Sequence, residues 1–210
     1  VLLPLPDDPE QFWEKGLKAK VRSQIRRPMK EGMETRFGPE ELEPFYRVFS
    51  RNMRDLGTPV LSRSFFEAVR AHLGSAVRFG VVYHQGEPVA AGCGFRWNDT
   101  FEITWASSLR EFNSLAPNML LYWRFLERMM EEGVATFDFG RCTPGGGTHR
   151  FKLQWGGSDH PLPWAQWSPG GVSATPSPDR PIFQMATSMW QKLPLAVANR
   201  VGPLLSRSLP

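Results

Sequence analysis

The sequence predicts an α/β domain, of the α+β kind, built on a mixed and mostly antiparallel β-sheet flanked by helices. Three observations lead to this expectation. Apolar residues recur at helical spacing in the segments before residue 75. They alternate with period two between residues 77 and 107, with turn residues at two points. A long helical segment then returns into a short apolar run at 137–140, and such a unit adds a parallel strand to an antiparallel meander.

The N-terminal third is predicted to be mostly helical. Residues 9–31 begin with proline and glutamate, as first helical turns often do, and they carry a basic amphipathic stripe. Pro28 is expected to bend or end this helix, because a proline removes one backbone hydrogen bond. Residues 39–57 and 62–74 have the spacing of two further amphipathic helices, each closed by a glycine.

Four strands are expected in the first half of the chain, at 33–38, 77–83, 89–97 and 100–107. The last three form an antiparallel meander, because Gln-Gly-Glu-Pro and Asn-Asp separate them and suit hairpin turns. Gly92 and Gly94 lie inside one of these strands. Glycine in a strand interior indicates a bulge or a close backbone approach, so we expect one of the two there.

The C-terminal half begins with a strong helix at 117–133, and a buried strand at 137–140 follows it. One more strand with loops is expected within 158–171. Residues 173–181 are a linker by composition, rich in serine and proline. The tail beyond them is predicted to form two short amphipathic helices separated by Pro194.

The composition favours one folded domain and excludes several classes of protein. Of 210 residues, 41% are hydrophobic, which is enough for a buried core. The net charge of +4 favours anionic partners without singling out nucleic acid. Cys93 and Cys142 form no CxxC motif and no ligand cluster with histidine, so no metal site is expected. With no apolar run of membrane-spanning length and no signal-peptide pattern, a reducing cytoplasmic location is expected.

The loop after the 137–140 strand holds the residues with the clearest chemical potential. TPGGGTH lacks the Gly-Lys-[Ser/Thr] ending of a phosphate-binding P-loop, so its glycines form either a flexible turn or a close approach to a ligand. Lys152 has Phe151, Leu153 and Trp155 around it. Apolar neighbours desolvate an ammonium and lower its pKa. Such a lysine could stabilise an oxyanion, position a phosphate or shuttle a proton, and the alternative is a snorkelling surface lysine.

Further candidates for binding lie at three places. Asn118 is in the first turn of the 117–133 helix, where unpaired N–H groups suit a phosphate or carbonyl oxygen, although any helix start has this form. Arg141 follows the strand end, and His149 follows the glycines and could act as an acid or a base. The first helix has a basic face that suits a diphosphate or an RNA backbone, or is only a solvated surface: Lys18, Lys20, Arg22, Arg26 and Arg27.

A family resemblance rests on four segments: KAKVRSQIRRPMKEG, FYRVFSRNMRDLGTPVLSRSFFEAV, NMLLYWRFLERMMEEGVATFDFGR and GTHRFKLQWGG. Over most of residues 12–167 the chain resembles the FemA/FemB/FemX family. It looks most similar to the FemAB-like proteins associated with exosortase (PEP-CTERM) and exopolysaccharide gene clusters. LGTPVLSRSFF and FKLQWGG are the most specific parts.

This resemblance implies an acyltransferase fold of the GNAT type, with transfer of aminoacyl groups from charged tRNA to amines on peptidoglycan precursors. It divides the chain into a basic leading helix (1–32), a GNAT-like domain (33–171), and a linker with a helical tail (172–210). Family members carry two such domains, so a missing N-terminal GNAT-like domain is expected.

At matching positions, the resemblance places Phe151 and Lys152 at the reaction centre. It implies that Arg22, with Arg26 as second choice, contacts a substrate diphosphate. Arg141, Asn118 and His149 complete the predicted substrate-binding set. No general base, cofactor or metal is assigned. The expected acyl donor is aminoacyl-tRNA or acyl-coenzyme A, and the expected acceptor is an anionic small molecule or a polysaccharide precursor.

Three functional classes stay open from the sequence. The first is a Fem-type transferase that forms an amide on an acceptor related to the cell envelope or to exopolysaccharide, at the inner face of the membrane without stable insertion. The second is an N-acyltransferase that uses acyl-coenzyme A, although the spaced glycines of its usual pyrophosphate loop are not evident at 110–118. The third is a non-catalytic binding module.

Overall fold

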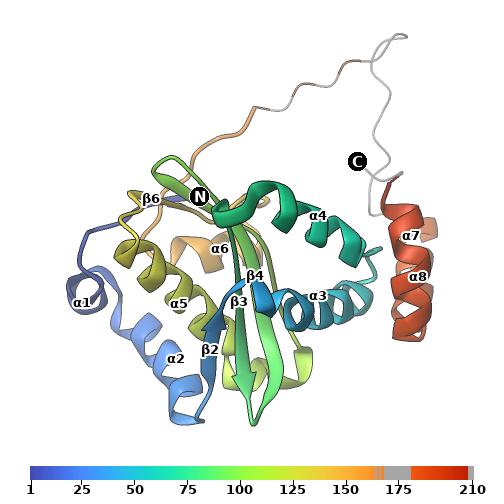
Figure 1. Cartoon of the computed structure of the whole chain (residues 1–210), viewed down its shortest axis with the longest axis horizontal. Helices are drawn as coiled ribbons and strands as arrows, with labels where there is room; N and C mark the ends of the chain where they lie inside the picture. Colours follow the sequence, from blue (N-terminus) through green and yellow to red (C-terminus); the bar gives the residue numbers. More distant parts are fainter. Residues whose placement is uncertain (164, 166, 168–180, 208–210) are drawn as a thin grey trace.

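The computed structural model describes residues 1–163, 165, 167 and 181–207 (Figure 1). Its strands are β1 (Leu2–Pro4), β2 (Glu34–Phe37), β3 (Val77–His84), β4 (Glu87–Trp97), β5 (Thr100–Ser108) and β6 (Thr136–Asp138). Within the described residues they form one sheet in the order β1-β6-β5-β4-β3-β2. β5 and β6 are parallel, and the other neighbours are antiparallel. The predicted fold class is confirmed.

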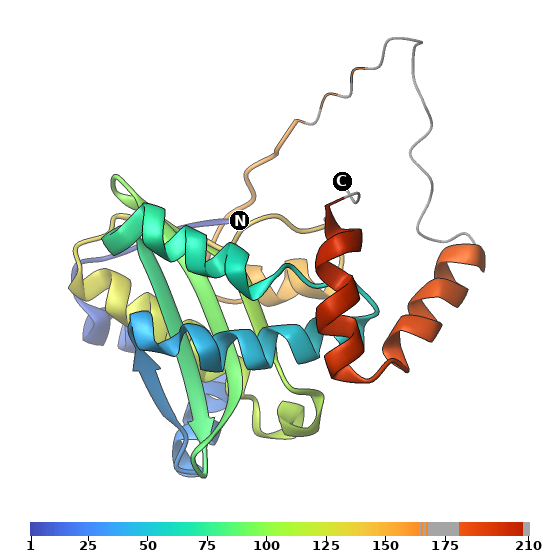
Figure 2. The same ribbon diagram turned by 45° about the vertical axis from the view of Figure 1, so that its right-hand side comes forward.

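Helices cover both faces of this sheet (Figures 1 and 2). The longer ones are α2 (Ala19–Lys30), α3 (Leu42–Leu56), α4 (Arg63–Leu73), α5 (Pro117–Glu131), α7 (Pro181–Gln191) and α8 (Leu195–Ser206). The shorter ones are α1 (Pro9–Gln11), the π-helix η1 (Phe12–Gly16), the 3₁₀ helices η2 (Pro39–Glu41), η3 (Gly74–Ala76) and η4 (Arg110–Leu115), and α6 (Gly147–Leu153).

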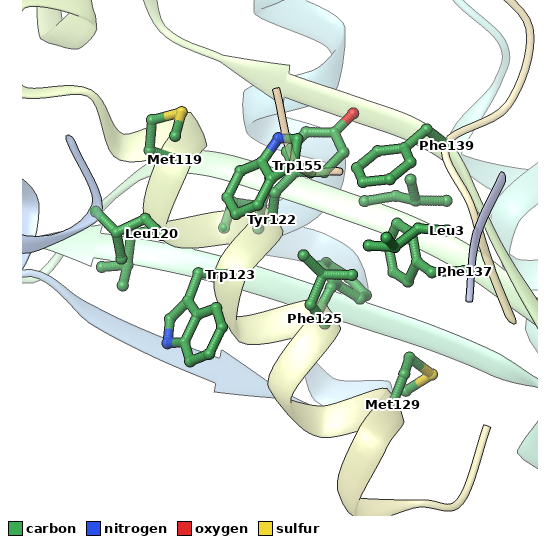
Figure 3. Packing of buried hydrophobic residues seen from close by; sticks show 14 of the residues in the cluster. Leu3, Met119, Leu120, Tyr122, Trp123, Phe125, Met129, Phe137, Phe139 and Trp155 are labelled. Atoms are coloured by element: carbon green, nitrogen blue, oxygen red, sulfur yellow. The ribbon is translucent and has the colours of Figure 1, made fainter. Parts of the chain in front are cut away.

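The core has two parts, one on each face of the sheet. Residues of α2 and α5 form one cluster, and residues of α3 and α4 form the other. Adjacent β3 residues point to opposite faces, as strand geometry requires, so Val82 belongs to the first cluster and Val81 to the second. Figure 3 shows the aromatic part of the first cluster, where Tyr122 and Phe125 of α5 lie near Phe137 and Phe139.

The two glycines of β4 show both predicted features. A Cβ at Gly92 would lie 2.9 Å from the ring of Phe125, so only glycine allows α5 to approach this closely. The β4–β5 register shifts between Cys93 and Gly94, because Trp105 and Ile103 are their respective partners. Thr104 is therefore the extra residue of a bulge in β5, which bends this strand just after its pairing with β6 ends.

Four predicted elements need correction. The helix expected at 9–31 is divided into α1, η1 and α2, because Leu17 is extended and ends the π-helix. Pro28 does not end α2, which continues to Lys30 with the proline ring buried. Residues 147–153, for which no helix was predicted, form α6. Within 158–163 the only ladder contact is an isolated bridge from Ser158 to Leu2, and most of 164–171, the rest of the range of the predicted strand, lies outside the described residues. β1 itself was not predicted.

The predicted tail helices are confirmed as α7 and α8, with Pro194 between them. They form a hairpin against α3 (Figure 2). Arg54 Nη1 donates a hydrogen bond to the Leu193 carbonyl at 3.0 Å, which ties the hairpin to α3. Residues 173–180 of the predicted linker lie outside the described residues. In the described part of the chain, no helix has both the length and the apolarity needed to cross a bilayer.

Candidate active site at the parting of two parallel strands

The candidate site lies where β5 and β6 separate. The two strands are paired through only three residue pairs, of which Glu102 and Asp138 are the last. β6 then ends, while β5 continues to Ser108 through the bulge. At Gly140 the backbone adopts φ +71°, a left-handed angle that glycine adopts without strain, and the chain turns away from the sheet. Beyond Glu102 and Asp138 the two strands no longer pair with each other, although β5 still pairs with β4 and the end of β6 pairs with β1.

The side chain of Lys152 extends from α6 to the point where β5 and β6 separate. Its side chain is buried, with 4% of the residue exposed. Its Nζ donates hydrogen bonds to the carbonyl oxygens of Gly140 at 2.9 Å and Arg141 at 2.8 Å. An ammonium has three N–H donors, and residues in the described part of the chain accept two of them. The predicted burial of this cation is therefore borne out by its geometry, and the snorkelling alternative is not.

Two carboxylates accompany the lysine. A Cβ built on Gly140 would lie 3.5 Å from Glu102 Oε1 and 3.9 Å from Lys152 Nζ, so both groups lie close to the same glycine. Glu102 and Asp138 line a cavity of about 390 Å³, with Arg141 on the same wall. Both carboxylates are therefore placed beside a space that a ligand could fill. Sequence reasoning did not identify Glu102, and it noted Asp138 only as a neighbour of Arg141.

Burial shifts the two central groups in opposite directions. It lowers the pKa of the Lys152 ammonium, while Cys142, Asp138 and Glu102 oppose that shift. It raises the pKa of the Glu102 carboxyl, and Asp138 raises it further, while Lys152 lowers it. Lys152 is enclosed by protein, and Glu102, although exposed, has lost part of its surrounding water, so each group holds its charge less firmly than in water. Such a pair is suited to exchanging a proton with a ligand.

Phe151 faces a different space from Lys152, although the two are adjacent on α6. Its ring meets the buried Tyr122 ring at 4.9 Å and the Trp155 ring at 6.2 Å, both edge to face. Figure 3 shows Trp155 and Tyr122 side by side in this aromatic cluster, with Phe139 next to them. These contacts fix α6 against α5. With α6 held in this position, Lys152 reaches the strand end and the adjacent Phe151 lines a larger cavity.

The larger cavity, of about 650 Å³, lies at the first turn of α5. Its wall includes Lys18, Lys20, Asn118, Arg150 and Phe151, and no carboxylate among the described residues. Ala116, the residue before the first turn, has no side chain that could accept from the N–H groups of that turn. Three cations and the positive end of the α5 dipole together make the cavity strongly attractive to anions.

The predicted arginines of the first helix have other contacts. Arg22 Nη1 donates hydrogen bonds to the carbonyls of Trp13 and Glu14, at 3.2 and 2.9 Å, and so closes the π-helix. Arg26 lies over the Trp13 ring at 5.3 Å. Neither residue lines the cavity at α5. Lys18 and Lys20, from the same basic segment, line this cavity instead.

His149 holds the glycine loop. Its Nδ1 accepts a hydrogen bond from the Gly145 N–H at 2.9 Å, and its Nε2 lies 2.7 Å from Asp159 Oδ1. Since Nδ1 accepts, Nε2 carries the proton and donates to the carboxylate. Both ring nitrogens are thus engaged, although His149 lines a neighbouring cavity of about 600 Å³ together with Arg141. No group of His, Cys, Asp or Glu within the described residues has the arrangement of a metal site.

Comparisons with known proteins agree on the fold. The family described as "Acetyltransferase (GNAT) domain" matches residues 17–153, well over half of the chain. The structure of FemX superposes with a TM-score of 0.64 at 14% identity, covering 74% of this chain and 57% of FemX. The C-terminal domain of a putative lysylphosphatidylglycerol synthetase from Agrobacterium fabrum gives 0.58 at 13% identity, covering 75% of this chain and 56% of that one.

A conserved protein of unknown function from Bacteroides thetaiotaomicron superposes with a TM-score of 0.51 at 12% identity, covering 73% of this chain and 54% of that one. No protein of curated function matches the sequence. The chain therefore spans a little over half the length of these similar structures. At such identities the likeness establishes the fold, and the GNAT type implied by the Fem resemblance is confirmed.

Proposed function

The chain belongs to the GNAT acetyltransferase-domain family, and we propose that it transfers an acyl or aminoacyl group to an amine in the manner of the Fem proteins. The observation that carries this proposal is the buried Lys152 ammonium, held by the carbonyls of Gly140 and Arg141 beside Glu102. A cation and a carboxylate near the same glycine suit amide formation from an ester or thioester, because one can stabilise the oxyanion and the other can accept a proton.

The reaction begins when the neutral amine nitrogen attacks the carbonyl carbon of the donor. Negative charge develops on the carbonyl oxygen, and the Lys152 ammonium stabilises it from a site with little water. Glu102 accepts the proton that the amine loses, since its raised pKa makes it a stronger base than an ordinary carboxylate. The carbon–oxygen or carbon–sulfur bond to the leaving group then breaks, and the leaving group takes up that proton.

The donor is proposed to bind in the cavity at the start of α5. Lys18, Lys20 and Arg150 attract its phosphates, and the positive end of the α5 dipole adds to that attraction. The 3′ end of an aminoacyl-tRNA and acyl-coenzyme A both carry such phosphates. Aminoacyl-tRNA is favoured, because η4 and Ala116, with φ +56°, stand where a coenzyme A enzyme usually has spaced glycines.

The acceptor is proposed to be an amine on a precursor of the cell envelope or of an exopolysaccharide, at the inner face of the membrane. The likeness to FemX supports this class, as does the name of the lysylphosphatidylglycerol synthetase, which indicates an aminoacyl product. A setting in peptidoglycan synthesis or in an exosortase (PEP-CTERM) system follows from the sequence resemblance alone. A binding module without catalysis is the competing function, since the chain spans just over half of FemX.

Thermal-shift measurements with three ligands test the donor. Stabilisation by charged tRNA, and less by uncharged tRNA, is the expected result, because binding to the folded state raises the melting temperature. A shift with acyl-coenzyme A alone would assign the second class of transferase. If tRNA, acyl-coenzyme A and nucleotide-sugar precursors all leave the melting temperature unchanged, and no amide product forms, the binding module remains as the function.

A further inference from the structure

The tail helices expose large apolar side chains in an ordered pattern. Leu204 is 65% exposed and Met189 is 64% exposed, and the others are Met185, Val197, Val201 and Leu205. On α7 the two methionines are four residues apart, and on α8 the valines and Leu204 follow at intervals of four and three. This is the spacing of a continuous stripe along a helix. Single exposed apolar residues are ordinary, but stripes on two successive helices call for an explanation.

The stripe on α8 is not the face that packs on the domain. Ala198 and Gly202 are the buried residues of this helix, and a Cβ on Gly202 would lie 2.9 Å from the Val60 backbone nitrogen. At 100° per residue, Val197, Val201 and Leu204 fall within an arc of about 60°, next to the docked face and separate from it. The hairpin is therefore held by one side of α8, and its apolar stripe is left uncovered by the described residues.

The charges of this hairpin have one sign. Residues 181–207 contain Lys192, Arg200 and Arg207 and no aspartate or glutamate. All three cations are exposed. Arg200 and Arg207 flank the apolar stripe of α8 on the side away from the domain, by the same helical angles. An apolar stripe bordered by arginines is the arrangement found in helices that lie in a membrane interface.

We propose that the α7–α8 hairpin docks the domain onto a membrane surface that contains anionic lipids. The stripe of α8 lies among the headgroups, parallel to the surface, and Arg200 and Arg207 meet the lipid phosphates. Each helix is too short to cross the bilayer, so the contact is peripheral. A second copy of the chain fits this face less well, because it would bring two acid-free faces together. The proposal stands independently of the transfer chemistry.

Sedimentation with lipid vesicles tests the docking. We expect the 210-residue chain to bind vesicles of phosphatidylcholine mixed with phosphatidylglycerol at least about tenfold more tightly than vesicles of phosphatidylcholine alone, with salt weakening the binding. Arg200→Gln and Arg207→Gln should each weaken it roughly fivefold. The triple variant Val197→Ser, Val201→Ser, Leu204→Ser should weaken it at least about tenfold while the melting temperature stays unchanged, because those side chains are exposed.

Two control variants separate this face from exposed residues in general. Leu73→Ser on α4 and Arg36→Gln on β2 also change exposed side chains and should leave vesicle binding intact. Equal binding to both kinds of vesicle, or equal losses in the control variants, would overturn the proposal. So would concentration-dependent dimers that the triple variant dissociates, since they would assign the face to a second copy.

Discussion

Two regions of this molecule depart from the usual distribution of side chains, in opposite directions. At the parting of β5 and β6, the charged Lys152 is buried beside Glu102. On the α7–α8 hairpin, large apolar side chains such as Leu204 are exposed. A buried charge is costly unless other groups compensate it, and an uncovered apolar stripe gains nothing for the isolated domain. Both departures are therefore better explained by ligands than by stability.

The difference between the regions lies in how strongly each is held. Lys152 has two carbonyl partners, a carboxylate nearby and an aromatic cluster behind α6, so its position is fixed before any ligand arrives. The stripe of α8 is exposed, from 37% at Val201 to 65% at Leu204, and its neighbouring face is fixed through Gly202. We expect substitutions in the first region to affect chemistry and those in the second to affect location.

The largest expected effect is on Lys152. Lys152→Ala should lower the rate of transfer by about 10³-fold, because a single donor to an oxyanion contributes roughly that much. Lys152→Arg should not restore the rate, since a planar guanidinium cannot occupy the ammonium position between the two carbonyls. Single-turnover rates with aminoacyl-tRNA measure the effect.

Because Lys152 is buried, its loss also weakens the fold, and the two effects must be separated. Lys192→Ala, an exposed cation of the tail, is the control and should keep the full rate. Rates should be compared only at temperatures where circular dichroism shows the variant folded. A folded Lys152→Ala protein with an unchanged rate would remove this lysine from the chemistry.

The second effect concerns Glu102 and pH. The raised pKa of Glu102 means that its carboxylate forms only above the usual range, so the transfer rate should rise with pH through that value. Glu102→Gln should remove this rise of the transfer rate with pH, which is the acidic limb of the pH–rate profile, and should lower the rate by about 10²-fold. Asp138→Asn should move the limb to lower pH, since Asp138 contributes to the upward shift. If the transfer rate of the Glu102→Gln variant still rises with pH over the same range, another group accepts the proton.

The same pKa shift predicts a change of stability with a definite sign. The folded protein holds the Glu102 proton to higher pH than the unfolded chain does, so stability falls as pH rises from about 4.5 through the raised pKa. Glu102→Gln cannot lose that proton, and its melting temperature at neutral pH should be higher than that of the parent. An unchanged melting temperature would mean that solvent screens the exposed Glu102 carboxylate.

The sheet and the buried lysine could be predicted from the sequence because both leave local patterns. Period-two alternation and the glycines at 92 and 94 fixed the meander and its bulge. The apolar neighbours of Lys152 marked it as a candidate, but they did not indicate that it lies in a helix. Phe151 and Trp155 are four residues apart, which fits one face of a helix as well as it fits alternation.

The remaining site residues left no such pattern. Glu102 alternates with the buried Phe101 and Ile103, as any solvent-facing strand residue would, and only the parting of β5 and β6 gives it a role. Arg22 and Lys20 belong to the same basic segment. Which of them faces the cavity depends on η1, a π-helix that the apolar spacing does not indicate. β1 is three residues long, and its pairing is decided by tertiary contacts.

A third, smaller effect separates the cations of the leading segment. Lys18→Ala combined with Lys20→Ala should raise the KM for the donor about tenfold and leave kcat nearly unchanged, because phosphate contacts act on binding. Arg22→Ala should instead lower stability by about 1 kcal/mol, through the lost bonds to the carbonyls of Trp13 and Glu14. Donor titrations and denaturant unfolding measure the two. A KM effect of Arg22→Ala larger than that of the lysine pair would return the donor contact to the arginine.

The smallest effects are expected on the tail, where two neighbouring faces of α8 should respond differently. Gly202→Val should destabilise the docked hairpin by about 1–3 kcal/mol, because its Cβ would meet the Val60 backbone. Valine is preferred to alanine here, since the higher helix propensity of alanine would offset about 1 kcal/mol of the strain. Leu204→Ser should change stability by less than about 0.5 kcal/mol, as exposed positions usually do. Hydrogen exchange of the α8 amides resolves this local opening from global unfolding. Equal protection in both variants would mean that the exposed stripe also holds the hairpin, and the contrast between the two faces of α8 would fail.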